Sequence, residues 1–249
     1  MKKLVVIITI LILFIPKVNA STSSASSYIL MDSTTGRVLM SKDMHTRRLI
    51  ASITKIMTAT LAIESGKLND VVEVSPIIKE AYGSGIYIEV GEEITLKDLV
   101  YGLMLRSGND AAMMISEYIG GTTEEFVNKM NKKAKELGMK ETTFYNPSGL
   151  PTPSGNYSSV YDMAILTKYA MNSPVYQEIV KTKTYKVTTN KKTYLWHNKN
   201  KLLKYDYITG GKTGYTEESG RTLVSTANID NMSLIVVTIR DSDDWNTHL

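Results

Sequence analysis

The hydrophobic positions near the start of the chain form two short runs with the composition of β-strands. These runs are residues 28–31 and 37–40, and Asp-Ser-Thr-Thr-Gly at 32–36 separates them. Asp, Ser and Gly favour tight turns between strands. The pattern therefore predicts an antiparallel hairpin close to the N-terminus.

Hydrophobic residues at helical spacing dominate the middle of the chain. In the first such segment, Ile53, Ile56, Met57 and Leu61 share one face, and Gly66 provides a stop. Two later segments open with a Thr or Ser that an Asp follows three residues on, which resembles a capping box. The predicted helices cover residues 52–65, 95–105, 110–119, 123–137 and 159–170.

The last part of the chain is strand-like, because β-branched residues become frequent there. Residues 142–158, rich in Pro, Gly and Ser, form a loop before this change, and Asp230-Asn231 predicts a hairpin turn. This order predicts an α+β fold, in which the N-terminal hairpin joins the C-terminal strands in one antiparallel sheet flanked by helices. The predicted strands cover residues 184–189, 193–196, 221–227 and 233–239.

Residues 1–20 have the pattern of a secretory signal peptide. Two lysines precede an apolar run at 4–15, and Val-Asn-Ala at 18–20 resembles a cleavage site. The alternative is an uncleaved membrane anchor, although the run is shorter than the about 20 residues that a spanning helix needs. We expect cleavage after Ala20, export across the cytoplasmic membrane to the extracellular or cell-wall face, and a flexible Ser-rich leader at 21–27.

Charge and composition exclude several function classes. Without the predicted signal segment, 26 Lys and Arg face 25 Asp and Glu, so no basic surface of the nucleic-acid-binding kind is expected. The chain has no cysteine, which excludes disulfides and thiol catalysis. The histidines at 45, 197 and 248 do not have the spacing of metal ligands. We therefore expect no metal and no nucleic acid partner.

Ser52 and Lys55 form the first candidate catalytic pair. A serine hydroxyl is a weak nucleophile that needs an adjacent base. Residues three apart share a helix face, so the Lys55 amine would lie beside the Ser52 hydroxyl. A lysine can act as a base where burial and neighbouring cations lower its pKa. Ser-x-x-Lys alone is a weak motif, but it occurs only here in the chain.

Ser107-Gly108-Asn109 is the second candidate element, between two predicted helices. Ser107 could relay a proton between Lys55 and a leaving amine, and Asn109 could bind a substrate carbonyl or orient Lys55. The alternative is an ordinary helix-capping turn. Ser154-Gly155-Asn156 has the same letters, but it lies in the Pro-rich loop with no helix leading into it. Context therefore favours Ser107.

The third candidate element is Lys212-Thr213-Gly214, which follows two further glycines and precedes a predicted strand. Lys212 offers a cation for a substrate carboxylate or for lowering the pKa of Lys55, and Thr213 can donate a hydrogen bond to that carboxylate. Gly214 allows close approach of a substrate backbone. The alternative is a Gly-rich turn with a solvated lysine.

The three motifs in this order resemble the serine D-Ala-D-Ala carboxypeptidases, the low-molecular-mass penicillin-binding proteins of peptidase family S11. The resemblance extends from Tyr28 to Ile239. Beyond the motifs it includes the segments Met31-Asp32-Ser33-Thr34-Thr35-Gly36-Arg37-Val38-Leu39, Ile56-Met57-Thr58-Ala59, Asp110-Ala111-Ala112, Leu137-Gly138-Met139, Asn146-Pro147-Ser148-Gly149-Leu150 and Tyr215-Thr216.

The resemblance implies a catalytic domain at 28–249 with the fold of penicillin-binding proteins and β-lactamases, including a smaller all-helical region. It implies that Ser52 attacks the carbonyl between two D-alanines of a peptidoglycan stem, that Lys55 takes its proton, and that Ser107 and Asn109 assist. Lys212, Thr213 and Gly214 would line the cleft, and the backbone N–H groups of Ser52 and Tyr215 would form the oxyanion hole. β-Lactams would acylate Ser52. We expect no cofactor, and a monomer.

Two departures from the family leave questions open. Many members carry a C-terminal β-rich domain and an amphipathic anchoring helix, and we expect neither in this chain. Many also place an arginine just beyond the last strand to bind the substrate's terminal carboxylate. Here His248 lies near that position, and Arg240 is the other candidate.

Three other functions remain as alternatives. A β-lactamase shares the first chemical step, but residues 142–158 contain no glutamate to activate a deacylating water as in class A enzymes. A wall-binding module without turnover would be expected to carry a broken motif. A purely structural envelope protein would make three intact motifs a coincidence.

Overall fold

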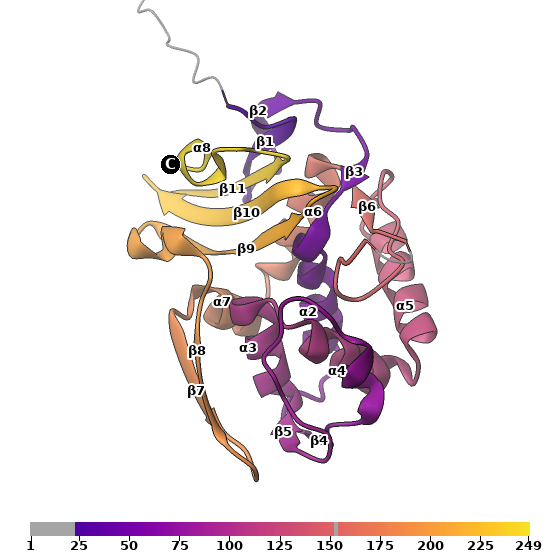
Figure 1. Ribbon diagram of the computed structural model, residues 1–249. Helices are drawn as coiled ribbons and strands as arrows, with labels where there is room; N and C mark the ends of the chain where they lie inside the picture. The colour runs from indigo at the N-terminus through magenta and orange to yellow at the C-terminus, as the bar shows by residue number, and fades with distance from the viewer. Residues whose placement is uncertain (1–22, 152–153) are drawn as a thin grey trace, which may run out of the picture.

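A five-stranded antiparallel sheet forms one layer of the protein in a computed structural model that describes residues 23–151 and 154–249 (Figure 1). Its strand order is β2-β1-β11-β10-β9, so the N-terminal hairpin pairs with the C-terminal strands. This confirms the predicted α+β fold and the predicted pairing of the N-terminal hairpin with the last strands of the chain. The strands are β1 (Ser27–Asp32), β2 (Val38–Lys42), β9 (Ile208–Thr216), β10 (Gly220–Ile229) and β11 (Met232–Ile239).

The turn between β10 and β11 is the predicted one. Asp230 and Asn231 have φ values of 48° and 65°, and Ile229 pairs with Met232. Two successive residues with positive φ are the mark of a type I′ hairpin turn, which Asn and Asp tolerate better than most residues.

Helices fill the rest of the structure, and the predicted caps are present. Thr95 Oγ1 accepts a hydrogen bond from Asp98 N at 3.0 Å, and Ser159 Oγ accepts one from Asp162 N at 3.1 Å. The helix predicted at 52–65 is divided into a 3₁₀ helix, η1 (Ala51–Thr54), and an α-helix, α2 (Lys55–Glu64). The other predicted helices are α3 (Leu96–Arg106), α4 (Asn109–Gly120), α5 (Thr123–Glu136) and α6 (Val160–Ala170).

Several short elements differ from the sequence prediction. Strands β7 (Thr184–Thr188) and β8 (Thr193–His197) form a separate two-stranded hairpin that projects from the body instead of joining the main sheet (Figure 1). The amphipathic helix α7 (Pro174–Lys181) was not predicted. The remaining elements are β3 (Arg48–Leu49), β4 (Val71–Glu73), η2 (Pro76–Glu80), β5 (Glu93–Thr95), β6 (Tyr157–Ser158), η3 (Lys201–Lys204) and α8 (Asp244–Thr247).

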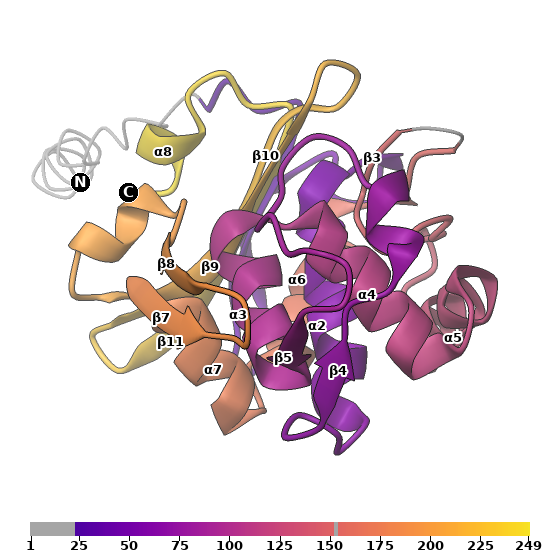
Figure 2. The ribbon, with the colours of Figure 1, turned by 60° about the horizontal axis from the view of Figure 1, so that its bottom comes forward.

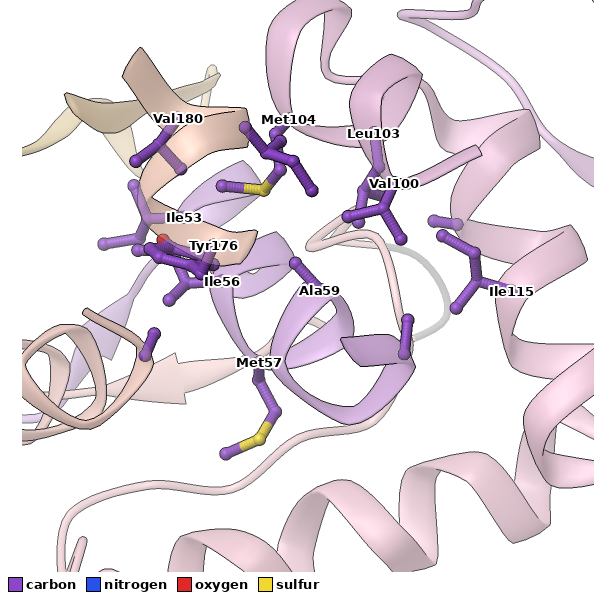
Figure 3. Close-up of a cluster of buried hydrophobic side chains, with 14 of the residues drawn as sticks. Ile53, Ile56, Met57, Ala59, Val100, Leu103, Met104, Ile115, Tyr176 and Val180 are labelled. Carbon is purple, nitrogen blue, oxygen red and sulfur yellow. The ribbon is translucent and has the colours of Figure 1, made fainter. Parts of the chain in front are cut away.

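Hydrophobic side chains pack against both faces of the sheet. The larger cluster surrounds α2, with Ile53 and Ile56 among side chains from α3, α4 and α7 (Figure 3). A smaller cluster on the other face contains Leu223 and Ala227 of β10, with Trp245 of α8 packed against it. Figure 2 shows α8 and the main helical layer on opposite sides of the sheet. We call these the helical face and the outer face.

Only part of the predicted N-terminal segment lies within the residues that the structure describes. The predicted signal segment at 1–20 lies outside the described residues. Residues 23–26 pack on the domain, which differs from the expected flexible leader: Ala25 is buried, and Ser26 N donates to Ile239 O at 3.1 Å. None of the helices in the described part of the chain has the length and apolar character needed to cross a bilayer.

Candidate active site

Ser52 and Lys55 lie side by side at the start of α2. Lys55 Nζ is 3.1 Å from Ser52 Oγ. The 3₁₀ conformation of η1 explains this approach, because side chains three residues apart eclipse each other in a 3₁₀ helix. Ala51, just before the serine, has a φ of 47°, an uncommon value for a residue with a side chain. The chain therefore makes a sharp turn that presents Ser52.

Lys55 is completely buried, with an exposed fraction of 0%. Its Nζ donates hydrogen bonds to Asn109 Oδ1 at 2.7 Å and to the Ser148 carbonyl at 2.6 Å. Burial, followed by the positive charges of Lys212 and Lys199, holds the pKa of Lys55 well below its usual range. A neutral amine has two N–H groups and one lone pair. In the neutral form, the two carbonyls would take both N–H groups, and the lone pair would be left for the Ser52 hydroxyl proton.

The second motif forms the connection between α3 and α4. Ser107 ends α3 in the left-handed conformation, with φ of 62°, and α4 begins at Asn109. Asn109 Nδ2 donates to the Tyr82 carbonyl at 2.5 Å, which fixes the amide with its oxygen toward Lys55. Ser107 is 5% exposed, and its hydroxyl makes no hydrogen bond within the described part of the chain. The structure thus joins Asn109 to Lys55, while the proton-relay role of Ser107 stays a prediction.

The third motif precedes the predicted strand, which is β10, but it also lies inside a strand of its own, β9, that was not predicted. β9 is an edge strand of the sheet, and Lys212 pairs with Val224 of β10, whose side chain belongs to the helical face. Lys212 is 2% exposed, and its Nζ donates to the Thr213 carbonyl at 2.7 Å. Burial, with a smaller effect of Lys199, lowers the pKa of Lys212 to about 7.

Gly214 brings β9 into contact with the nucleophile. A Cβ atom at this position would lie 2.9 Å from the Ser52 backbone nitrogen and 3.2 Å from that of Ile53. Only glycine therefore allows the strand to pack directly on η1. The next residue, Tyr215, is 65% exposed at the open edge of the sheet. The backbone N–H of Ser52 thus lies beside β9, as the predicted oxyanion hole requires.

The loop at 146–150 is part of the site, although its composition alone predicted only a connection. Besides the Ser148 carbonyl that accepts from Lys55, Thr58 Oγ1 of α2 donates to the Pro147 carbonyl at 2.6 Å. Gly149 has a φ of 87°, and a Cβ there would collide with the Ala51 carbonyl. The segment Asn-Pro-Ser-Gly-Leu was part of the family resemblance, and this was the one signal that could have identified it.

Asn156, the last residue of the second Ser-Gly-Asn copy, holds this loop in place. Its Oδ1 accepts hydrogen bonds from the backbone nitrogens of Tyr145 at 2.7 Å and Asn146 at 3.1 Å. Its Nδ2 donates to Thr54 Oγ1 at 3.0 Å. The second copy is therefore a structural anchor between the loop and η1, consistent with the choice of Ser107 as the motif.

His248 is not brought to the site, so its predicted role in substrate binding is not supported. It is 6% exposed, with Nδ1 2.7 Å from Ser225 Oγ and Nε2 3.0 Å from Thr238 Oγ1. Ser225 alternates with Val224 along β10, so it lies on the outer face, opposite Lys212. Burial lowers the pKa of His248 to about 3. The other candidate, Arg240, lines a surface pocket with Arg47, Arg48 and Glu218, away from Lys212.

A known protein family matches most of the chain, and its description agrees with the geometry of the site. The family model for D-alanyl-D-alanine carboxypeptidase, Peptidase_S11, matches residues 16–243. D-alanyl-D-alanine carboxypeptidase DacF of Bacillus subtilis (strain 168) is 45% identical over 224 residues, which cover 86% of this chain and 56% of that protein. DacB2 of Mycobacterium tuberculosis is 33% identical over 205 residues, with 82% and 70% covered. The chain spans little more than half the length of the Bacillus relative.

Solved structures with the same fold extend this similarity. D-alanyl-D-alanine carboxypeptidase of M. tuberculosis H37Rv matches with a TM-score of 0.86 and 30% identity, covering 90% of this chain and 86% of the other. The Streptomyces K15 DD-transpeptidase matches with a TM-score of 0.84 and 31% identity, covering 89% and 92%. The α+β arrangement described above is thus the fold of penicillin-binding DD-peptidases.

Proposed function

The chain belongs to the D-alanyl-D-alanine carboxypeptidase family, Peptidase_S11, and we propose that it removes the terminal D-alanine from peptides ending in D-Ala-D-Ala through an acyl-enzyme on Ser52. The observation that carries the proposal is the 3.1 Å contact between Ser52 Oγ and the Nζ of a fully buried Lys55, whose pKa burial lowers. This geometry places a base beside the serine without a histidine.

Acylation begins when Lys55 Nζ removes the Ser52 hydroxyl proton as Oγ attacks the carbonyl carbon of the penultimate D-alanine. The carbonyl oxygen becomes an oxyanion, and the N–H groups of Ser52 and Tyr215 would stabilise it. The C–N bond then breaks, and the proton passes to the leaving D-alanine nitrogen. Ser107 is the proposed carrier, since it lies in the same connection as Asn109, whose amide binds Lys55.

Deacylation returns the enzyme to its starting state. A water molecule gives one proton to the base and attacks the ester carbonyl, the ester C–O bond breaks, and Ser52 Oγ recovers a proton. Gly214 supports this scheme because it holds β9 against the serine, and the free edge of β9 can pair with an extended peptide. No step of this scheme calls for a metal or an organic cofactor.

The proposal also covers the reaction with β-lactams, the place where the enzyme acts and its oligomeric state. A β-lactam would acylate Ser52 by the same attack, in line with the penicillin-binding fold. The signal-like sequence at 1–20 supports action on peptidoglycan outside the cytoplasmic membrane, where the stem peptides lie. We propose that the enzyme acts as a monomer, because every group in the mechanism comes from one chain.

The test is D-alanine release from a synthetic peptide ending in D-Ala-D-Ala. The chain is compared with Ser52→Ala, with Lys55→Met and with Ser65→Ala, a matched serine at the end of α2. We expect release from the unaltered chain and from Ser65→Ala, and none from the other two. Release by Ser52→Ala would overturn the assignment of the nucleophile. Absence of release from the unaltered chain, with or without added amine acceptors, would overturn the proposed activity.

A further inference from the structure

Three arginine side chains line one small pocket beside the end of strand β11. Arg47 precedes β3, Arg48 begins it, and Arg240 directly follows β11. The chain has only six arginines among its 29 basic residues, so half of its arginines lie at this one place. Ser52 and Lys212 do not line the pocket, which is therefore separate from the proposed catalytic site. The other lining residues are Leu49, Tyr157, Glu218, Ser219 and Ile239.

These three guanidinium groups form no ion pair within residues 23–151 and 154–249. Arg48 Nε donates to Ser27 Oγ at 2.8 Å. The Arg47 guanidinium packs over the Tyr157 ring, 5.2 Å from its centre. Glu218 shares the pocket, but it is exposed and pairs with none of the three arginines. Three cations against one carboxylate leave the pocket with a net charge of +2.

The backbone holds Arg240 at the pocket in a conformation that is unfavourable for a residue with a side chain. Its φ is 54°, in the left-handed region. The Arg240 carbonyl accepts from Ser26 N at 3.2 Å, and a Cβ on Gly220 would lie 3.1 Å from Arg240 Cγ. These neighbours fix the direction in which the side chain leaves the backbone. Backbone strain of this kind clusters at functional sites.

We propose that this pocket binds a phosphate monoester. A guanidinium can donate two parallel hydrogen bonds to phosphate, and a phosphate group has enough oxygens for three arginines, whereas a carboxylate offers only two. A monoester carries a charge of about −1.5 to −2 at pH 7, which matches the net charge of the pocket. The pocket volume of about 200 Å³ is below the about 300–1,000 Å³ typical of drug-sized ligands, so it suits a single phosphate group.

Isothermal titration of the chain with glycerol 3-phosphate at low salt tests the proposal. Arg47→Gln and Arg240→Gln should each weaken binding by about ten- to hundredfold, since a hydrogen bond between charged groups is lost. Glu218→Gln should strengthen binding by about two- to fivefold, because it removes the one negative charge of the pocket. Arg37→Gln removes an exposed arginine outside the pocket and is the matched control.

Two comparisons separate a phosphate site from general attraction of anions. Arg240→Lys keeps the charge but not the two parallel hydrogen bonds, so it should lose most of the affinity. Acetate and dimethyl phosphate carry a single charge and should bind several-fold more weakly than glycerol 3-phosphate. Equal affinity for acetate and glycerol 3-phosphate would overturn the proposal, and so would equal binding by the Arg37→Gln, Arg47→Gln and Arg240→Gln variants.

Vesicles identify the source of the phosphate group. Co-sedimentation with phosphatidic acid vesicles that is lost in Arg47→Gln would assign the site to a lipid headgroup. Binding of glycerol 3-phosphate without vesicle binding would assign it to a soluble ester. Urea unfolding of each variant shows whether its fold is intact, and Arg47→Gln with Arg240→Lys still decides the matter if Arg240→Gln unfolds. No measurement here uses D-alanine release, so the outcome is independent of the proposed function.

Discussion

Asn109 Oδ1 lies 2.7 Å from Lys55 Nζ, and both side chains are buried. A neutral amide at this position accepts a hydrogen bond from the amine without adding the negative charge that would stabilise the ammonium form. The same contact made by a carboxylate would raise the pKa of the lysine. The choice of Asn in the second motif therefore keeps the base in its working form.

Asn109→Asp should shift the acid limb of the pH–rate profile for acylation to higher pH. A carboxylate within hydrogen-bond distance favours the ammonium form and raises the pKa of Lys55, so the unprotonated base appears only at higher pH. The rate of penicillin acylation, measured from pH 5 to 10, reports this limb. Asn228→Asp, on the exposed end of β10, should leave the profile in place. An unmoved limb in Asn109→Asp would show that Lys55 is not the base.

Asn156→Ala should destabilise the protein and slow acylation together. The change leaves the backbone nitrogens of Tyr145 and Asn146 without their acceptor, which costs about 1–3 kcal/mol for each group that stays buried. We expect the free energy of unfolding in urea to fall by about 2–4 kcal/mol. Ser154→Ala in the same tripeptide is exposed and should be neutral. Normal acylation by a destabilised Asn156→Ala would mean that the loop does not position Lys55.

Gly214→Ala should reduce acylation without requiring a loss of fold. The added methyl group would collide with Thr222 Oγ1 of β10 and meet the Ser52 backbone nitrogen at 2.9 Å, so β9 must shift relative to both β10 and the nucleophile. A displacement of about 1 Å in a catalytic group can slow a reaction about hundredfold.

Gly138→Ala is the control for this change. Gly138 has a φ of 73°, and an added methyl group would have no atom within 4 Å, so alanine there costs about 1 kcal/mol of stability through its backbone conformation alone. This variant should acylate normally. Equal acylation rates in the two variants would contradict the role given to Gly214.

His248 should weaken the protein in mild acid. Its pKa is about 3 in the folded state and near 6.5 in an unfolded chain, so below pH 6.5 the unfolded state binds more protons. Stability is then lost as the pH falls from 6.5 toward 3, by at most about 1.4 kcal/mol per pH unit from this group. Urea unfolding at pH 7, 6 and 5 should show a flatter pH dependence for His248→Gln. Its D-alanine release at pH 7 should stay within threefold of the unaltered chain, and a larger loss would return His248 to the site.

The regular elements were predictable because their signals are local. The caps at Thr95 and Ser159, the turn at Asp230-Asn231 and the face of α2 all follow from residues a few positions apart. The hairpin β7–β8 was predicted as strands, but its separation from the main sheet depends on packing against α3 and on contacts with the segment before β5. No local pattern contains that information.

The parts of the site that depend on the identity of a side chain were predictable from the sequence. Ser52, Lys55 and Asn109 meet as expected, because spacing and motif both specify them. Ser148 accepts the Lys55 hydrogen bond with its backbone carbonyl. Any residue could supply this group, so the sequence could not identify position 148 as part of the site. The prediction for His248 was wrong because a position just after the last strand does not show on which face of the sheet the following residues pack.

The position of β1 has a consequence for the order in which the molecule can be built. β1 lies inside the sheet, and Ser27 pairs with Ile239, so the first strand described must wait for the last one. Such sequence-distant pairing raises contact order and slows folding, because the loop entropy is lost before the contacts form. The apolar side of β1 therefore stays uncovered until the segment around residue 239 is available to pair with it.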